Sequence, residues 1–489
     1  MKEECCKNNK EECSIGVCSI DEIKDNYDYI IIGWGAAAFA GAIKAQELGV
    51  KNILMVGFGL IGGTCVNVGC VPSKFMLNAG ELYNYSANNK YFQGVSLKKN
   101  KLDYTKLVKQ KNKLVLGQRQ EKYQKVVDAL KNVDVVDGKA TFVSKDTITV
   151  NGKKIKADKF LIANGSRTFI PPIEGIEKVN YLTNVEALEL NKLPKSMIIL
   201  GASTLGLEFA QMFNNFGTKV TVIQRSNTIL TRLEPEISTL MHETLLKDGI
   251  DVLTAINSKK VSEKNNEIFL EVEMDSKNKI IRAEKLLIAT GRIPNSDLLG
   301  IENTTVEINK KAVKVNKYLQ TSQENIYATG DIIGEPMLET VAGYEGSLAT
   351  SNIFGKKERE MDFNNVPYGI FTNPQIAGVG LSEKELKEKG IEYDVRTLSL
   401  DMVPKNAIVG ETNGLIKMMI EPKTTKILGC HMIGSHAADI IQEVVLAKKY
   451  GICANEIIDS LHIFPTITEA IKLICVSFQK DLKKLSCCV

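Results

Sequence analysis

No stretch of this sequence is long and apolar enough to predict a membrane span. The longest apolar run, residues 29–43, is shorter than the roughly 20 residues that a spanning helix needs, and glycines interrupt it. The residues before it are acidic and rich in cysteine, without the basic segment that opens a secretory signal peptide. The sequence therefore predicts a protein of the cytoplasm.

The chain also lacks a strong excess of either charge. It carries 62 Lys and Arg against 58 Asp and Glu, which gives a formal net charge of +4 over 489 residues. Nucleic acids and anionic membranes are bound through concentrated positive charge, so neither is predicted as a partner. With 44% hydrophobic and 25% charged residues, the composition is that of a globular protein with several domains.

The 11 cysteines cannot all pair within the chain, because their number is odd. In a reducing compartment they indicate redox or metal chemistry instead of a disulfide framework. The polar leader, residues 1–26, shows no periodicity and predicts either a flexible tail or a soft-metal site at its thiols. The clustered cysteines are Cys5, Cys6, Cys13 and Cys18 in this leader, then Cys65 and Cys70, and finally Cys487 and Cys488.

Two segments of the chain predict dinucleotide-binding units. Residues 27–57 have the pattern of a strand, a turn of small residues, a helix and a second strand, and residues 196–225 repeat this order. Residues 156–167 and 282–295 also resemble one another. Beyond about residue 366 the pattern changes to alternating strands and helices without a glycine fingerprint, which predicts a separate final domain.

The first unit carries a dinucleotide fingerprint. Gly33, Gly35 and Ala38 fit the pattern G-x-G-x-x-A directly after the strand. Glycines permit the tight turn and let a pyrophosphate approach the N-terminus of the next helix. The acid that binds the ribose hydroxyls should end the second strand, but Gly57 stands there. Either the backbone or another side chain must then hold this ribose.

The second unit predicts the nucleotide donor. Its turn contains Gly201, Ser203 and Gly206, and its second strand ends at Arg225. An acid at that position favours NAD, whereas a guanidinium suits the 2′-phosphate of NADP. We therefore expect NADPH, with Arg232 close enough to assist. The alternative is that Arg225 is an ordinary surface cation.

Two thiols lie between these units in the stretch GGTCVNVGCVPSK. In a regular helix Cys65 and Cys70 would be separated by about 7.5 Å along the axis, too far for a disulfide. Gly69 before and Pro72 after the second thiol predict a distorted segment that brings the thiols together. A dithiol beside a dinucleotide site indicates a redox relay, because a flavin can pass two electrons to a disulfide.

These segments resemble the flavoprotein disulfide reductases, the family of glutathione reductase and dihydrolipoamide dehydrogenase, from about Asp28 to the end. The matching motifs are GTCVNVGCVPSK, IANGSR, IATGRIPN, YATGDI and FTNPQIAGVG. The resemblance implies an α/β fold with two Rossmann-like dinucleotide-binding domains, for FAD and NADP, and a C-terminal α+β dimerisation domain. It also implies a homodimer in which both chains build each active site.

The implied domains and site residues follow the family order. Cys65 would be the interchange thiol facing the substrate and Cys70 the thiol next to the flavin, while Lys74 and Glu208 would pair near flavin N5 and Asp331 would hold the ribityl chain. The domains would be a Cys-rich flexible leader (1–26), an FAD-binding domain (27–180), an NAD(P)-binding domain (181–300), the second part of the FAD or central domain (301–365) and a dimerisation domain with the Cys-Cys tail (366–489). The implied cofactor-binding residues are Gly33, Gly35, Ala38, Gly63, Thr64, Lys74, Asp331, Gly201, Ser203, Gly206, Arg225 and Arg292.

The final domain departs from the disulfide-reducing members. These carry H-P-T-x-x-E, whose imidazole protonates the leaving thiol. The matching stretch here is HIFPTITE, with Phe464 before Pro465 and Glu469 retained as a catalytic candidate. A phenyl ring has no titratable proton, so the general acid of thiol–disulfide exchange is missing. His462, two residues earlier, would share a side with Phe464 in an extended segment and is the candidate substitute.

The chain ends in LSCCV, with Cys487 and Cys488 adjacent. Neighbouring Cα atoms lie about 3.8 Å apart, whereas relaxed disulfides need roughly 4.4–6.8 Å between Cα atoms, so a disulfide between these two cysteines is disfavoured. The pair is better interpreted as two ligands for one soft metal ion, or as two thiols without a function. The mercury(II)-reducing branch of the family resembles this chain in its terminal LSCC, in GTCVNVGC and in a Phe before the same Pro. The resemblance implies that Cys487 and Cys488 of one subunit pass Hg(II) to Cys65 and Cys70 of the other.

Three departures from that branch accompany the resemblance. Members of that branch often carry a separate metal-binding domain at the N-terminus, whereas here residues 1–26 precede the first predicted strand. Thr204 and Thr466 stand where tyrosines are expected near the metal path, and Gly57 replaces the ribose acid. Two alternatives therefore stay open. One is a dihydrolipoamide dehydrogenase-like or other disulfide reductase, against which Phe464 argues. The other is a catalytically inactive, thiol-based metal-sequestering protein, against which the Cys65 and Cys70 pair argues.

Overall fold

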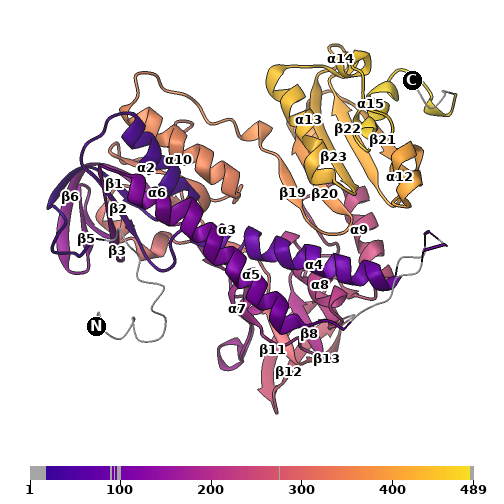
Figure 1. Cartoon of the computed structure of the whole chain (residues 1–489), viewed down its shortest axis with the longest axis horizontal. Helices are drawn as coiled ribbons and strands as arrows, with labels where there is room; N and C mark the ends of the chain where they lie inside the picture. Colours follow the sequence, from indigo (N-terminus) through magenta and orange to yellow (C-terminus); the bar gives the residue numbers. More distant parts are fainter. Residues whose placement is uncertain (1–17, 89–90, 93, 96–100, 275, 485–489) are drawn as a thin grey trace. The chain divides into compact units, whose positions relative to one another are not determined.

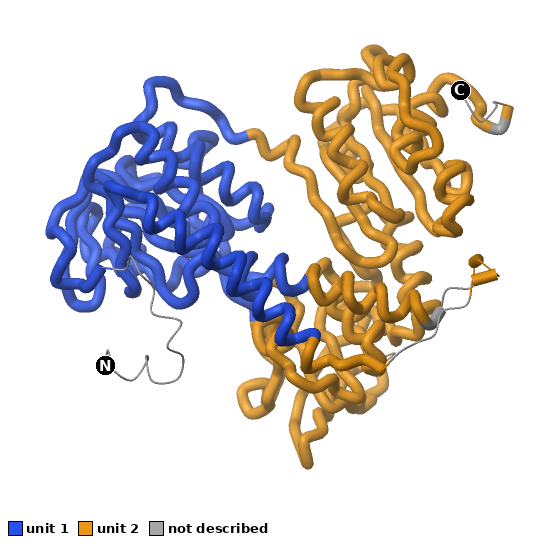
Figure 2. Tube along the Cα trace, viewed as in Figure 1, with its two compact units in different colours: residues 1–73, 107–169, 292–361 blue, residues 74–106, 170–291, 362–489 orange. Residues whose placement is uncertain are grey.

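A computed structural model describes residues 18–88, 91–92, 94–95, 101–274 and 276–484 of the chain. The chain divides into two compact units, each built from three segments (Figure 2). Unit 1 comprises residues 1–73, 107–169 and 292–361, and unit 2 comprises residues 74–106, 170–291 and 362–489. None of the helices in the described part of the chain has the length and apolar composition of a membrane span.

Unit 1 is built around a sheet whose central strands are parallel, in the order β3-β2-β1-β6, and these four strands are labelled in Figure 1. Strand β18 also pairs with β6 in parallel. Residues 30–32 of β1 are buried on both faces, as expected for a parallel strand that is covered on both sides. Helices α2 and α10 pack against each other, and the Tyr29 hydroxyl lies 2.9 Å from that of Thr350. The elements are β1 (Asn26–Ile32), α2 (Ala36–Glu47), β2 (Ile53–Gly57), α3 (Gly63–Val68), α5 (Tyr104–Arg119), α6 (Lys125–Ala129), β3 (Val133–Asp137), β4 (Thr141–Ser144), β5 (Thr147–Val150), β6 (Lys153–Ile162), β7 (Ser166–Thr168), β15 (Arg292–Pro294), β16 (Ile308–Asn309), β17 (Ala312–Val313), β18 (Ile326–Ala328) and α10 (Glu339–Phe354).

Unit 2 contains a second parallel sheet, in the order β10-β9-β8-β14, and an antiparallel sheet of β11, β12 and β13. The turn after β8 leads into α8, which repeats the arrangement of β1 and α2 in unit 1. The elements are α4 (Cys70–Asn88), α7 (Asn184–Glu189), β8 (Ser196–Leu200), α8 (Thr204–Asn215), β9 (Lys219–Ile223), α9 (Pro235–Lys247), β10 (Asp251–Leu253), β11 (Asn257–Lys264), β12 (Glu267–Met274), β13 (Lys277–Ala283) and β14 (Lys285–Ile288).

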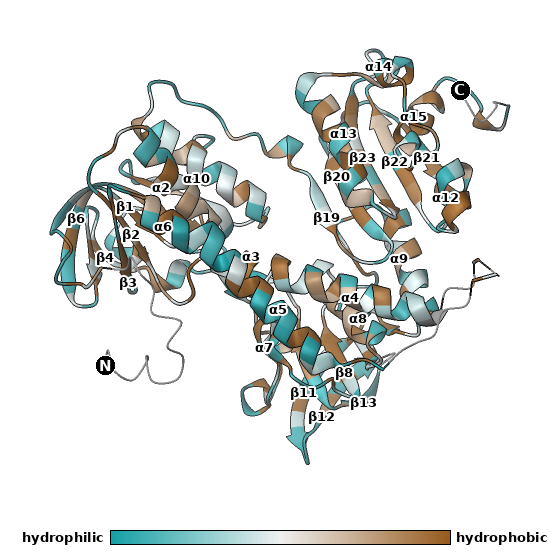
Figure 3. Cartoon of the chain, in the orientation of Figure 1, coloured by the Kyte–Doolittle hydropathy of each residue, from teal (hydrophilic) through white to brown (hydrophobic). Residues whose placement is uncertain are grey.

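The C-terminal part of unit 2 is an antiparallel sheet in the order β19-β20-β23-β22-β21, packed against helices. Figure 3 shows hydrophobic residues along β22, β23 and α13, where the buried core of this domain lies. The elements are β19 (Tyr368–Ile370), β20 (Gln375–Gly380), α11 (Glu383–Lys389), β21 (Asp394–Ser399), α12 (Pro404–Val409), β22 (Leu415–Ile420), β23 (Ile427–Gly434), α13 (Ala437–Tyr450), α14 (Ala454–Asp459) and α15 (Glu469–Val476).

The predicted fold class is confirmed by the two parallel sheets with their strand–turn–helix units and by the final α+β domain. The second half of the predicted leader differs from the expectation. Ile23 is 3% exposed and belongs to the core of unit 1, and the Cys18 N–H donates to the Val135 carbonyl at 2.8 Å. The polar composition of residues 1–26 did not predict this contact, because only a few apolar side chains make it: Ile23 is buried, and Cys18 and Ile20 pack against the same core. The exact domain boundaries stay a prediction.

Candidate active site

The two redox thiols lie on either side of a break between α3 and α4. The break is at Gly69, where a Cβ atom would lie 2.9 Å from the Thr64 carbonyl oxygen and 3.0 Å from Cys65 Cα. Only glycine fits such a close approach of backbone to backbone. The helix is therefore interrupted at Gly69, and the side chains of Cys65 and Cys70, both free thiols, form a hydrogen bond with each other.

A carboxyl group that the sequence did not point to lies beside the first thiol. Cys65 donates a hydrogen bond to Glu339, the first residue of α10, and the Tyr123 hydroxyl donates to Glu339 Oε1 at 3.1 Å. The hydrogen bond with Cys70, burial and the charge of Glu339 all raise the pKa of Cys65. Burial likewise raises the pKa of Glu339. Cys65 is thus held as a thiol beside a carboxyl that can take its proton.

Lys74 and Glu208, expected as a pair, are brought together in unit 2. Lys74 Nζ lies 2.6 Å from Glu208 Oε2, and the Glu208 side chain is only 4% exposed. The Phe371 N–H donates to the other carboxylate oxygen at 2.9 Å, and the lysine ammonium lies 4.8 Å from the centre of the Phe371 ring. Glu208 is therefore fully paired, and Lys74 has one fixed position.

Asp331 and Arg292 form a polar cluster in unit 1 together with Ser166. Arg292 Nε donates to Ser166 Oγ at 2.7 Å and lies 3.6 Å from Asp331 Oδ2, while the Ser166 hydroxyl donates to Asp331. The Asp331 carboxylate is thus held by a hydrogen bond from Ser166 in β7 and by an ion pair with Arg292 in β15.

The glycine turn of unit 1 fits the diphosphate of FAD. Helix α2 begins after Gly35 without a side-chain cap and with no acid in its first turn, so its N-terminal N–H groups point at an anion site. Ala38 in that turn is fully buried. A Cβ at Gly63, next to Thr64 in the second turn, would lie 2.8 Å from Gly35 Cα, so the two turns lie against each other. Bound FAD would be held by these residues and by Asp331.

The turn of unit 2 has the same form. Helix α8 begins at Thr204 after Ser203, again without a side-chain cap or an acid in its first turn. A Cβ at Gly206 would lie 2.0 Å from the Gly201 carbonyl oxygen, so the turn is as tight as in the first unit. Arg225 is exposed two residues after β9, as a phosphate-binding side chain must be. The residues present fit a second dinucleotide.

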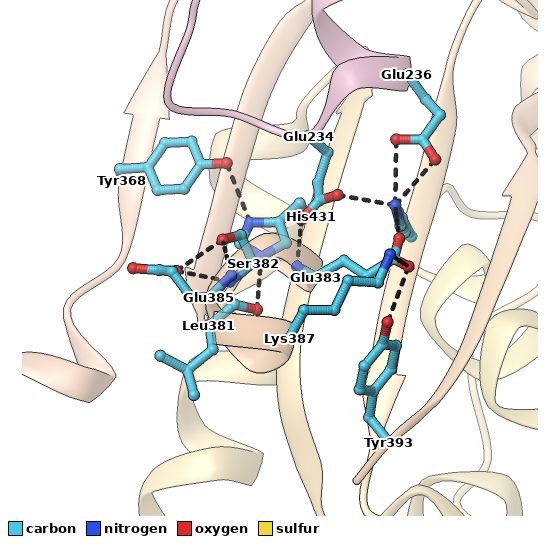
Figure 4. Close-up of polar contacts among 11 residues, drawn as sticks. Glu234, Glu236, Tyr368, Leu381, Ser382, Glu383, Glu385, Lys387, Tyr393 and His431 are labelled. Atoms are coloured by element: carbon cyan, nitrogen blue, oxygen red, sulfur yellow. Dashed lines mark hydrogen bonds and ion pairs between the residues drawn. The ribbon is translucent and has the colours of Figure 1, made fainter. Parts of the chain in front are cut away.

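A buried lysine anchors the end of the segment that carries Arg225. In Figure 4 the carboxylates of Glu234, Glu236 and Glu383 converge on one ammonium nitrogen, which belongs to Lys417. The N···O distances are 2.8, 2.9 and 2.6 Å, and the side chains of Lys417 and Glu234 are each 2% exposed. Burial opposes the charge on Lys417, but the three carboxylates outweigh it and raise its pKa. This cluster links α9 to the C-terminal domain.

The segment where the general acid is missing is largely exposed. Phe464 is 50% exposed, and Glu469 accepts a hydrogen bond from the Thr466 N–H at 3.3 Å. His462, the candidate substitute for the missing acid, instead lies with Nε2 3.1 Å from Glu443 Oε1. Leu461 and Ile463 are 98% and 80% exposed.

Five of the predicted thiols lie outside the described residues: Cys5, Cys6, Cys13, Cys487 and Cys488. Of the leader thiols the structure thus describes Cys18 alone, whose backbone N–H pairs with Val135. Within the described ranges, no group of three or more His, Cys, Asp or Glu side chains is arranged to hold a metal ion. Among the predicted metal ligands, Cys65 and Cys70 are therefore the one pair of thiols that lies within the described ranges.

Two family profiles match the chain. One, described as pyridine nucleotide-disulphide oxidoreductase, covers residues 27–346, and the dimerisation domain of the same family covers residues 366–474. The chain belongs to the pyridine nucleotide-disulphide oxidoreductase family. Members use FAD and NAD(P)H, in agreement with the two turns, and the dimerisation domain indicates a homodimer.

Several curated relatives in this family are similar over nearly the whole chain. A mercuric reductase of Staphylococcus aureus is 41% identical over 98% of this chain and 87% of its own, and one of Streptomyces lividans is 37% identical over 94% and 98%. Among solved structures, the HOCl-induced flavoprotein disulfide reductase RclA from Escherichia coli has a TM-score of 0.82 at 27% identity, covering 93% of this chain and 100% of its own. A Cu(II) complex of RclA is similar as well, at 26% identity and a TM-score of 0.82.

A buried acid behind the Asp331 cluster predicts a pH effect on stability. Glu345 is 1% exposed and accepts a hydrogen bond from the Gly330 N–H at 2.6 Å. Burial, with a smaller contribution from Asp331, raises the pKa of Glu345 to about 7. The folded state therefore holds this proton more tightly, so its stabilising contribution is present below pH about 4.5 and is lost as pH rises through about 7.

Glu345→Gln is expected to remove this loss. Between pH 5 and 8 the wild-type protein should lose about 2–3 kcal/mol through Glu345, while the variant keeps the hydrogen bond from Gly330 without a titrating group. Thermal unfolding of unit 1, followed by flavin release, measures the difference. The exposed acid Glu302, changed to Gln, is the control. Equal pH dependence in wild type and Glu345→Gln would contradict the prediction.

Proposed function

We propose that this chain reduces Hg(II) to Hg(0) with two electrons from NADPH. The balanced reaction is Hg²⁺ + NADPH → Hg⁰ + NADP⁺ + H⁺. The observation that carries the proposal is the free dithiol of Cys65 and Cys70 at the helix break, in a chain whose curated relatives at 41% and 37% identity are mercuric reductases. Thiolates are the protein ligands that a soft ion prefers.

The residues of the chain divide the work. Bound FAD supplies the passage of two electrons from the nicotinamide to the metal. Cys65 and Cys70 hold Hg(II) between two sulfur atoms, and Glu339 accepts the proton that Cys65 loses on binding, because the thiol already donates to it. Lys74, fixed by Glu208, provides a positive charge that does not shift during turnover.

Phe464 supports a metal rather than a disulfide as substrate. Thiol–disulfide exchange needs an acid for the leaving thiol, whereas two-electron reduction of Hg(II) breaks two Hg–S bonds and returns the two thiolates of the chain, which need no added acid to leave the metal. His462 is a weak substitute for that acid because both of its ring nitrogens already have partners: Nε2 lies 3.1 Å from Glu443 Oε1 and Nδ1 lies 3.4 Å from the Ser460 carbonyl oxygen. The reducing compartment that keeps such thiols free is the cytoplasm.

Delivery of the ion is proposed to occur across the dimer. Cys487 and Cys488 of one subunit capture Hg(II) and pass it by ligand exchange to the redox pair of the other. The exposed apolar side chains of Leu461 and Ile463 beside Phe464 suit a surface that a partner subunit covers. Glu469 would keep this segment in place through its hydrogen bond with Thr466.

The test is anaerobic NADPH oxidation with Hg(II) in excess small thiol, beside oxidised glutathione, lipoamide and Cu(II). We expect turnover with mercury. In Cys487→Ala/Cys488→Ala the KM for the mercury–thiol complex should rise roughly tenfold at little change in kcat, because tethered ligands act at high effective concentration. Turnover with disulfides alone would replace the proposal by a disulfide reductase. Metal binding without NADPH oxidation would replace it by a sequestering protein.

The NADPH preference is tested at Arg225. Arg225→Ala should raise the KM for NADPH about 10- to 100-fold and leave that for NADH nearly unchanged, because a charge-assisted contact with the 2′-phosphate is lost. Arg282→Ala, which removes another exposed arginine of the same unit, is the matched control. An equal rise in the KM values for NADPH and NADH would show that Arg225 does not bind the 2′-phosphate.

A further inference from the structure

Trp34, in the middle of the first glycine turn, occupies the space that a side chain at position 57 would need. It is the single tryptophan of the chain and is 6% exposed. A Cβ built on Gly57 would lie 2.2 Å from Cδ2 and 2.3 Å from Cγ of the indole. The ring therefore covers the end of β2, where a ribose-binding acid would otherwise stand.

The indole carries a buried donor that the protein leaves unused. Within the described part of the chain, Trp34 Nε1 is buried and has no hydrogen-bond partner. Buried indole N–H groups usually find an acceptor, because water has been removed from them. This donor therefore points to an acceptor that is not part of the polypeptide.

The backbone on both sides fixes the position of the ring. The Gly33 N–H donates to the Val56 carbonyl at 2.7 Å, and the Trp34 carbonyl accepts from the Gly62 N–H at 3.0 Å. The Gly57 carbonyl in turn accepts from the Gly138 N–H at 2.8 Å. The donor thus lies in a preformed part of the fold, at the carboxyl ends of parallel strands, where dinucleotides bind.

We propose that Trp34 replaces the missing acid as a ligand of the ADP half of FAD. Its indole N–H donates a hydrogen bond to an oxygen of that half, either a ribose hydroxyl or the diphosphate. The direction of the bond is reversed, because a carboxylate accepts from ribose hydroxyls whereas an indole can only donate. Trp34 and Gly57 then form a matched pair: the ring excludes the acid and takes over its contact.

The first test uses the fluorescence of the single tryptophan in the flavin-free dimer. ADP does not absorb at the excitation and emission wavelengths of tryptophan, and its binding should change the Trp34 emission. FMN lacks the ADP half of FAD, so its binding should leave the Trp34 emission unchanged. Adenosine separates the two acceptors. A change with adenosine indicates the ribose, and a change that needs ADP indicates the diphosphate. No change with ADP would overturn the proposal.

The second test is the affinity for FAD itself, followed by flavin fluorescence. Trp34→Phe keeps an aromatic ring but removes the N–H, and should weaken binding about three- to tenfold, since one hydrogen bond is lost. Melting of the flavin-free protein should be nearly unchanged. If Trp34→Phe bound FAD with the affinity of the wild type, the ring would only fill space in the core, and the proposal would be overturned.

The third test exchanges the pair. Gly57→Asp alone should lose FAD, because the new Cβ would lie 2.2 Å from the indole. Trp34→Ala/Gly57→Asp removes the ring and supplies the usual acid, so it should bind FAD more tightly than either single variant. If Gly57→Asp held FAD as well as the double variant, the indole would not occupy the place of the acid.

Discussion

Replacing Cys65 by serine is expected to lower Hg(II)-dependent NADPH oxidation by at least about a thousandfold. A hydroxyl is a poor ligand for a soft ion and cannot form a disulfide, so both the binding and the redox roles are lost together. Cys70→Ser should have an effect of the same size. Both variants should still show flavin bleaching by NADPH under anaerobic conditions, because that step does not need the thiols.

The control for this experiment is another partly exposed thiol. Cys453→Ser removes a free cysteine just before α14 that belongs to none of the motifs of the predicted site, and should keep wild-type turnover. Turnover of Cys65→Ser within tenfold of wild type would contradict the role of the dithiol. Loss of flavin bleaching in the same variant would instead place the defect at the cofactor.

Lys417→Met is expected to destabilise unit 2 by about 3–5 kcal/mol. The methionine fills a similar volume but leaves the Glu234 carboxylate, 2% exposed, without its cation. Glu383 should respond as well, because Lys387 and Lys417 together lower its pKa to about 2. Chemical denaturation at neutral pH, followed by a probe in unit 2, measures the loss.

Two further variants identify the buried charge as the cause. Glu236→Gln should cost less than about 1 kcal/mol, because the Glu236 side chain is 44% exposed and water replaces the partner. Lys417→Met/Glu234→Gln should recover part of the loss, since the neutral amide can still accept from the Glu383 N–H. A double variant as unstable as Lys417→Met would assign the loss to packing.

The elements around the two glycine turns could be predicted because their signals are local. A buried strand, a turn of small residues and an amphipathic helix follow one another within about thirty residues in each unit, and hydrophobic periodicity is sufficient to recognise them. The broken helix at the dithiol was also predictable, since Gly69 and Pro72 flank the second thiol. These residues fix the backbone where they stand, without help from distant parts of the chain.

The residues that sequence reasoning missed act over long distances. Glu339 lies 216 positions from Tyr123, its hydrogen-bond partner, and neither residue belongs to a motif. Lys417 lies 183 positions from Glu234. Their types carry no signal alone, because exposed Glu and Lys are common. Only the packing of α10 and β22 places them at the thiol and at the end of the nucleotide segment.

Gly57 shows a third kind of limit. The sequence revealed that the ribose acid is absent, but not why. The reason is a neighbour in space: the indole of Trp34 lies where the acid would begin. The signal in the sequence was therefore Trp34, a large residue at the variable position of the glycine fingerprint. The missing acid at position 57 is a consequence of that tryptophan.

The pairing of β18 with β6 has a consequence for how the protein is made. β6 ends at Ile162, and β18 begins only at Ile326, after the whole second dinucleotide-binding region has been synthesised. Translation adds about 5–20 residues per second, so the apolar edge of β6 stays without its partner strand for on the order of ten to thirty seconds. The intervening region is synthesised during this time, so mutations that delay the pairing of β18 with β6 would keep this strand edge exposed for longer and favour aggregation.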